Sequence, residues 1–263
     1  MKILAIALNT FRENVRDKVL YVLVVFAILL IAGSVVLGEL SIGQELKILV
    51  DLGLAAISLA GGLMAVFLGI GLVFKEMDRR TIYNIVSKPV QRRQFLLGKF
   101  LGLLLTLSVN VCVMTAGIYV ALLYLSGSWH GAFLNLLPAV LLVFAELVLL
   151  TSIALFFSTF SSPVLSAVLT LSLWFAGHFN NDLKQLAALA DSTSLDLLCT
   201  LLYYLLPNFL NFKYLGGDNV IRMAGYFRSP DAATFLAALS YGAVYSFAIS
   251  LGAAAIFKRR DFR

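Results

Sequence analysis

Charge is scarce in this 263-residue sequence, in which Asp, Glu, Lys and Arg make up 13% of the residues and apolar types make up 61%. Soluble domains average about 25% charged and about 45–50% apolar residues. The apolar residues here also come in long blocks, without the regular spacing of a half-buried helix or strand. This composition excludes a soluble globular domain and predicts an all-α integral membrane protein.

Metal and nucleotide motifs are missing as well. The two cysteines and two histidines have no ligand spacing. Gly98-Lys99 is followed by Phe100, where a phosphate loop needs Ser or Thr, and the sequence lacks H-E-x-x-H, C-x-x-C and G-x-S-x-G. We therefore predict that the chain binds no metal or cofactor and catalyses no covalent reaction. Any ATP and magnesium that its work requires would be held by a partner subunit.

Long apolar runs predict six membrane-spanning helices, because one crossing takes about 20 apolar residues for about 30 Å of hydrocarbon. The fifth run is short, and the turn-forming segment Ser158–Pro163 separates it from the fourth, so we expect these two to form a hairpin. The predicted spans are Val19–Gly38, Leu52–Phe74, Phe100–Leu125, Leu134–Phe157, Val164–Phe179 and Ala233–Phe257.

Lysine and arginine predict the orientation of these spans. Six crossings put both termini, the segment between the second and third spans and the Ser158–Pro163 turn on one side, with fifteen of the twenty Lys and Arg residues. The positive-inside rule assigns that side, and therefore both termini, to the cytoplasm. The net charge of +6 is thus interpreted as a topology signal, and we predict contact with the lipid bilayer and no nucleic-acid partner.

The chain is predicted to be a single transmembrane domain over residues 1–263. Residues 1–18 combine apolar and polar residues at helical spacing, which favours an amphipathic helix in the membrane interface. Residues 180–232 form the last outer loop. Within this loop, Leu195–Phe212 is apolar but contains Pro207 and Asn208, so we predict a helix that either re-enters the membrane or lies at the outer interface.

Residues 75–99 form a charged cytoplasmic segment between two apolar spans. Seven Lys or Arg residues occur from position 75 to 99, with two acids, a turn at Ser87–Pro89 and interleaved apolar residues. The segment has two interpretations that the residues alone leave open. It is either a solvated loop that touches anionic lipid headgroups, or a docking element for a soluble partner whose charges fix the register.

The same segment resembles a known family. The pattern E-x-x-x-R-T-I-x-x-I-x-S-K-P-V-x-R-x-x-F-L-L-G-K-F-L-G, from Glu76 to Gly102, is similar to the corresponding loop of ABC type-2 permeases. The stretches Ala7–Tyr21 and Phe257–Phe262 resemble the connecting helix and the cytoplasmic end of that family. Leu205–Phe212 resembles an outer-loop motif of the subgroup named for multicopper-enzyme maturation. One departure is Arg80, where many members carry Gly.

The resemblance implies a permease subunit of an ATP-binding-cassette exporter in the bacterial cytoplasmic (inner) membrane. Two permease copies, or one copy and a paralogue, would pair with two cytoplasmic ATPase subunits. The segment 75–99 would carry the coupling helix that transmits ATPase motion to the spans. The implied ATPase-coupling residues are Glu76, Arg79, Arg80, Thr81, Tyr83, Ser87, Pro89, Arg92 and Arg93.

Three polar residues within the spans are candidates for a pathway or for intramembrane structure. Glu146 lies mid-span, where a charge costs about 2.5–3.5 kcal/mol on insertion scales, so it should face the bundle interior. We expect it to bond to Asn110, Thr106 or Ser108 of the neighbouring span in preference to a pathway role. His178 is expected to cap the outer end of its span.

Small residues and alternative functions complete the predictions. Gly61, Ala65 and Gly69 recur every four residues, a spacing that favours close helix packing either within one subunit or across a dimer.

Two other function classes stay open. One is a membrane anchor that recruits a cytoplasmic partner without transport. The other is an autonomous channel, which the lack of intramembrane Lys and Arg disfavours.

Overall fold

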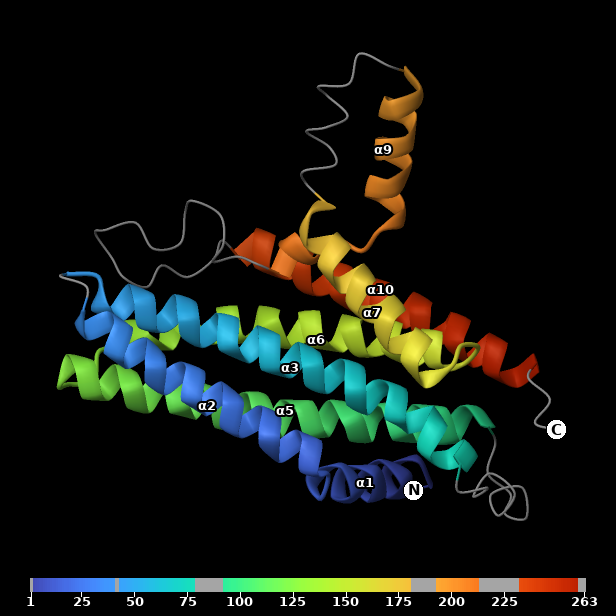
Figure 1. Cartoon of the computed structure of the whole chain (residues 1–263), viewed down its shortest axis with the longest axis horizontal. Helices are drawn as coiled ribbons and strands as arrows, with labels where there is room; N and C mark the ends of the chain where they lie inside the picture. The colour runs from blue at the N-terminus through green and yellow to red at the C-terminus, as the bar shows by residue number, and fades with distance from the viewer. Residues whose placement is uncertain (1, 41–42, 79–91, 181–192, 213–231, 260–263) are drawn as a thin grey trace.

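The computed structural model describes residues 2–40, 43–78, 92–180, 193–212 and 232–259, and every regular element in these ranges is a helix (Figure 1). This confirms the all-helical prediction for the described ranges. The long helices are α2 (Lys18–Glu39), α3 (Glu45–Asp78), α5 (Arg92–Ser126), α6 (Leu137–Ser158) and α10 (Ala232–Arg259). The shorter ones are α1 (Lys2–Val15), α7 (Pro163–His178), α9 (Thr193–Leu205) and the 3-10 helices η1 (Gly131–Leu136) and η2 (Phe209–Phe212).

Five of the six predicted spans form helices that are long and apolar enough to cross a membrane. These segments are Lys18–Glu39, Glu45–Leu72, Gln94–Ser126, Phe133–Ser158 and Ala232–Ile256. The other predicted span, Val164–Phe179, forms α7. Its 16 residues reach about 24 Å at a rise of about 1.5 Å per residue. This is less than the roughly 30 Å of the hydrocarbon core, so α7 is a helix as predicted, and its crossing of the membrane stays a prediction.

The helices on both sides of the charged segment are longer than their predicted spans. We expected spans at Leu52–Phe74 and Phe100–Leu125, but α3 runs from Glu45 to Asp78 and α5 begins at Arg92. Both ends of the segment 75–99 are therefore helical. Hydropathy marks the part of a helix that suits the membrane, whereas Lys, Arg, Glu and Gln have good helix propensity and can extend it beyond that part.

The predicted hairpin between the fourth and fifth spans is confirmed. α6 ends at Ser158 and α7 begins at Pro163. The Ser162 hydroxyl accepts a hydrogen bond from the backbone N–H of Leu165 at 3.4 Å, and Pro163 occupies the first helical position, where no intrahelical donor is needed.

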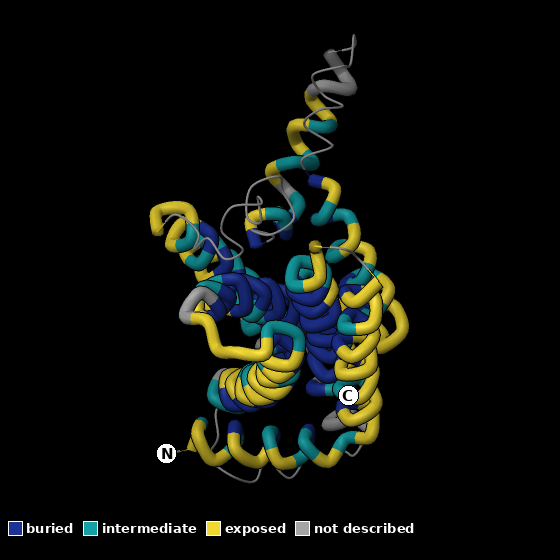
Figure 2. The backbone as a smooth tube through the Cα atoms, turned by 90° about the vertical axis from the view of Figure 1, so that its left-hand side faces the viewer, coloured by how far each residue is buried: buried dark blue, intermediate teal, exposed yellow. Residues whose placement is uncertain are grey.

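The core of the bundle lies between α3 and α6. These two helices are mostly buried, whereas α2 and α10 present most of their apolar surface outward (Figure 2). The stripe of small residues on α3 packs within the subunit. A methyl group at Gly61 would lie 2.6 Å from Leu147 Cδ1, and one at Gly69 would lie 3.0 Å from Ala154 Cβ, both on α6. These glycines allow the backbones of α3 and α6 to approach closely.

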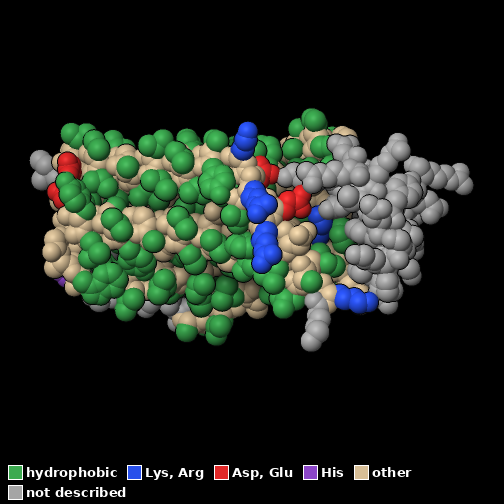
Figure 3. Space-filling view, turned by 90° about the horizontal axis from the view of Figure 1, so that it is seen from below, with side chains coloured by type: hydrophobic (Ala, Val, Ile, Leu, Met, Phe, Trp, Pro, Cys, Tyr) green, Lys and Arg blue, Asp and Glu red, His purple; other side chains and the backbone are tan. Residues whose placement is uncertain are grey.

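Four chain segments that we predicted on one side of the membrane lie toward one end of the bundle. The C-terminal end of α3, the start of α5, the α6–α7 turn and the end of α10 lie together, and α1 packs beneath the N-terminal part of α5 (Figure 1). Seen from below, hydrophobic side chains cover a broad area that ends at a narrow band of Lys and Arg (Figure 3). An apolar surface bounded by basic residues is expected where a membrane meets the cytoplasm.

The helix predicted within Leu195–Phe212 is present as α9, followed by η2. α9 stands away from the bundle (Figure 1) and exposes Leu197, Leu201 and Tyr204. Its position relative to the membrane, re-entrant or interfacial, stays a prediction.

Candidate coupling segment and intramembrane polar site

The nine predicted coupling residues divide into two groups. Glu76 lies in the last turn of α3, and Arg92 and Arg93 open α5. These two helix ends lie at the same end of the bundle (Figure 1). The other six lie outside the described residues: Arg79, Arg80, Thr81, Tyr83, Ser87 and Pro89.

Two glycines bring α1 against the start of α5. A methyl group at Gly98 would lie 2.8 Å from Cβ of Ile6, and one at Gly102 would overlap the carbonyl oxygen of Ala7. The backbones of the two helices therefore touch at these points, because only glycine has no Cβ to keep them apart. The predicted helix within residues 1–18 is thus present as α1, and it packs directly against α5, the helix that follows the charged segment.

Polar contacts strengthen the same junction. Lys99 of α5 is 6% exposed, and its Nζ lies 3.9 Å from Glu13 Oε2 of α1 and 5.4 Å from the Phe95 ring centre. Asn14, the next residue of α1, donates from Nδ2 to Oγ1 of Thr106 at 3.3 Å. Thr106 lies about two turns beyond Lys99 on α5. We assigned Lys99 to the charged segment, and the structure places it inside α5 as a link to α1.

The predicted partners of Glu146 are wrong. The side chains of Thr106, Ser108 and Asn110 donate to carbonyl oxygens of their own helix, namely those of Gly102, Leu105 and Thr106. Such local bonds satisfy a hydroxyl or amide within one helix, so nothing requires these groups to reach α6. Asn110 is 7% exposed, so it is buried, and its amide bonds within α5 and not to Glu146.

Glu146 is instead held by α3 and α7. Its side chain is 1% exposed. Oε1 accepts a hydrogen bond from Trp174 Nε1 at 2.8 Å, and Oε2 accepts one from Ser58 Oγ at 3.3 Å. Gly62 makes room for this indole, because a methyl group there would lie 2.6 Å from Trp174 Cη2. The prediction that Glu146 faces the bundle interior is confirmed.

His178 belongs to the same cluster. Its Nε2 lies 3.6 Å from Glu146 Oε1, and its Nδ1 lies 2.8 Å from the carbonyl oxygen of Trp174. The ring also stacks on Phe209 of η2, with centres 5.7 Å apart and planes inclined by 10°. His178 is the last residue of α7, and its ring faces Glu146, which lies midway along α6. Its role as a polar cap at the outer end of its span stays a prediction.

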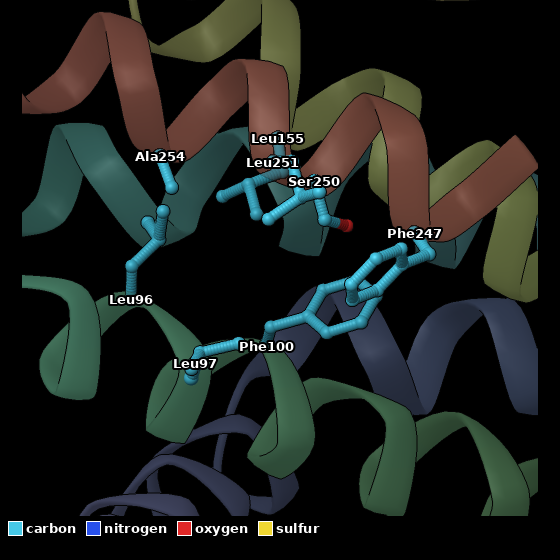
Figure 4. Close-up of a pocket in the computed structure, with 8 residues that line it drawn as sticks. All are labelled: Leu96, Leu97, Phe100, Leu155, Phe247, Ser250, Leu251 and Ala254. Atoms are coloured by element: carbon cyan, nitrogen blue, oxygen red, sulfur yellow. The ribbon is translucent and has the colours of Figure 1, made fainter.

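An apolar pocket of about 210 Å³ opens between α5, α6 and α10 (Figure 4). Its lining residues are Leu96, Leu97, Phe100, Leu155, Phe247, Ser250, Leu251 and Ala254. The Ser250 hydroxyl is buried and has no hydrogen-bond partner among the described residues. The pocket therefore suits a hydrocarbon group and offers one polar atom for recognition.

The apolar helices and their buried polar cluster define an integral, multi-pass membrane protein. Residues 4–262 match the sequence model of the ABC-2 family transporter proteins, so the chain belongs to that family. Family membership makes the chain the permease subunit of an ABC transporter, a transport subunit of a kind that generally lacks its own nucleotide site and works with a cytoplasmic ATPase. No individual curated protein matches the chain.

Proposed function

We propose that this permease subunit forms the pathway of an exporter in a bacterial cytoplasmic membrane. It would work as a dimer of two copies, or with a paralogue, and the segment 75–99 would couple it to the ATPase. Six spans, with both termini in the cytoplasm, are part of this proposal. Assignment to the multicopper-enzyme maturation subgroup is a further part, and its support is the Leu205–Phe212 motif.

The observation that carries the proposal is the length and position of α3 and α5. Their 34 and 35 residues correspond to about 50 Å each, well beyond the roughly 30 Å of the hydrocarbon core. Both helices reach the end of the bundle at which the charged segment joins them (Figure 1). A push on that segment would therefore act on two continuous helices that run into the buried core.

The α1–α5 junction supports the same function. Gly98, Gly102, Lys99 and Thr106 attach the start of α5 to α1. An amphipathic helix at the membrane interface would give α5 a fixed point about which to tilt. ATP binding would close the two ATPase subunits, and this motion would favour one of two membrane states through its contacts with the coupling residues.

Co-purification of the partner tests this proposal. The tagged chain is extracted in mild detergent from its native membranes, alongside a variant that carries Arg92→Glu and Arg93→Glu. Because these charges would fix the docking register, we expect an ATPase with a phosphate loop to accompany the wild type and to be lost from the variant.

The matched control carries Arg222→Glu and Arg228→Glu, two charge reversals in the predicted outer loop. This control should retain the ATPase. If the ATPase stays bound to the Arg92→Glu, Arg93→Glu variant, coupling through this segment is wrong. The rate of ATP hydrolysis is then compared between the ATPase alone and the ATPase bound to the permease. If the two rates are equal, the chain acts as an anchor and not as an exporter subunit.

A further inference from the structure

The pocket between α5, α6 and α10 opens on the apolar outer surface of the bundle (Figure 4). Leu155 of α6 is buried and closes it from the inside, whereas the lining residues Leu97, Phe247 and Leu251 are exposed. α10 packs mainly against α6, which leaves space between α10 and α5. All the lining residues lie in helical segments that are long and apolar enough to cross a membrane. In a bilayer, the pocket would therefore open to the hydrocarbon of the lipids.

The size and lining of the pocket suit part of an acyl chain. Apolar cavities of about 150 Å³ stay free of water and can hold a molecule such as benzene. This pocket is larger, at about 210 Å³, and serine is the one polar residue type in its lining. Lipid tails are as apolar as leucine, so filling the pocket does not by itself select one lipid. Selection requires polar or charged groups at the pocket.

Ser250 supplies a hydrogen-bond donor in the pocket. Its hydroxyl is buried and has no partner among the described residues. By contrast, Ser240 of the same helix donates to the carbonyl oxygen of Ala237 at 2.9 Å, a common way to satisfy a serine inside a helix. The ester carbonyls of a phospholipid are acceptors that lie between its chains and its headgroup. A phospholipid whose chain enters the pocket can therefore present an ester oxygen to Ser250.

Both walls of the pocket continue to a basic residue at the same end of the bundle. On α10, Lys258 follows Leu251 by seven residues and Ala254 by four, so the three share one helix face. On α5, Arg93 comes four residues before Leu97. The end of α10 and the start of α5 lie together (Figure 1). Each helix thus carries a positive charge about one turn beyond the pocket, where basic residues attract anionic headgroups.

We propose that this pocket binds one anionic phospholipid of the bilayer. One acyl chain fills the space between α5, α6 and α10, Ser250 donates to an ester carbonyl, and the phosphate lies beside Arg93 and Lys258. Ser250 and Lys258 are eight residues apart on α10, about 12 Å along the helix. The glycerol backbone and the lysine stem bridge this distance. The site needs neither an ATPase nor nucleotide, so this inference is independent of the proposed coupling.

A photoreactive lipid tests the site. The full chain is placed in phosphatidylcholine nanodiscs with a small share of a probe that carries a diazirine in one acyl chain. The probe is phosphatidylglycerol in one sample and phosphatidylcholine in the other, and cross-linked residues are located by tandem mass spectrometry. We expect the phosphatidylglycerol probe to label Leu96 and Phe100 about fivefold more, the factor that one basic contact supplies. Both probes should label the exposed Leu29 and Val36 of α2 equally.

A variant that fills the pocket tests the position of the acyl chain. Ala254→Phe places a ring in the pocket, and Ala255→Phe adds the same ring at the next position of α10, which is exposed. We expect Ala254→Phe to abolish labelling of Leu96 and Phe100 by both probes, and Ala255→Phe to leave it unchanged. A thermal melt checks that each variant is folded. Unchanged labelling in folded Ala254→Phe overturns the proposal.

A smaller change tests the hydroxyl without filling the pocket. Ser250→Ala removes the donor, and we expect it to reduce labelling of the pocket by both probes. Ser246→Ala is the matched control, because its hydroxyl is also buried without a partner in the described part of the chain but does not line the pocket. Equal labelling in Ser250→Ala and Ser246→Ala would contradict the bond to the ester.

The choice of headgroup is tested at Lys258, because Arg93 is also a predicted ATPase-coupling residue. Lys258→Gln should reduce the preference for phosphatidylglycerol and leave labelling by phosphatidylcholine unchanged. Arg259→Gln removes the next charge, about 100° around the helix, and should keep the preference. Equal labelling of the wild-type pocket by the two probes, or a wild-type preference in Lys258→Gln, shows that the site does not select an anionic lipid in this way.

Discussion

At the scale of single residues, glycines and polar groups determine where helices of this permease meet. Gly102 gives the clearest case, because it lets the α5 backbone touch the α1 backbone at Ala7. Adding a methyl group to such a contact lowers the free energy of unfolding by about 1–3 kcal/mol. At an open helix position, the same glycine-to-alanine substitution raises it by up to about 1 kcal/mol.

We therefore expect Gly102→Ala to lower the melting temperature of the chain in nanodiscs. Gly33→Ala is the matched control, since no atom lies within 4 Å of a methyl group added there. This control should melt at the wild-type temperature or slightly above it. Equal melting of the two variants would show that the tight contact of α1 and α5 does not contribute to stability.

The candidate intramembrane residues were predictable only in part. The position of Glu146 in an apolar run correctly predicts that it faces inward. Its partners could not be predicted, because the side chains of Thr106, Ser108 and Asn110 donate hydrogen bonds to backbone carbonyls of their own helix. The useful signal was the spacing of Trp174 and His178, four residues apart on one helix face.

At the scale of helices, the apolar runs predict which segments are helical more reliably than where each helix begins and ends. The Ser158–Pro163 turn was predictable because Ser162 and Pro163 provide a cap and a helix start. The starts of α3 and α5 were not predictable from the apolar runs. Charged residues with good helix propensity continue both helices past these runs.

The cap of α7 gives a prediction at this scale. Ser162→Ala removes the acceptor for the Leu165 N–H, and loss of such a cap typically costs about 1 kcal/mol. We expect the melting temperature to fall. Ser161→Ala is the neighbouring control, because the buried Ser161 hydroxyl has no partner among the described residues and its removal should be neutral or stabilising. A larger loss in Ser161→Ala than in Ser162→Ala would contradict the assigned cap.

At the scale of the whole molecule, the charge distribution predicts which end of the bundle faces the cytoplasm. In a background that lacks Cys112 and Cys199, Phe160→Cys reports on the α6–α7 turn, and Ser128→Cys reports on the segment after α5. Both positions are exposed. We expect a membrane-impermeant maleimide to label Ser128→Cys in intact cells and Phe160→Cys only in inverted vesicles. Labelling of both from the same side would contradict the six-span topology.

The central claim is that the charged segment contacts an ATPase, and photo-crosslinking in native membranes tests it most directly. A benzoylphenylalanine replaces Tyr83 in the segment in one sample. In the control it replaces Trp129, which follows the opposite end of α5 and is 54% exposed. Cross-linked partners are identified by mass spectrometry. The account predicts an ABC ATPase attached at position 83 and none at position 129. Cross-links at position 83 that contain only lipid, or an ATPase captured at position 129, would contradict it.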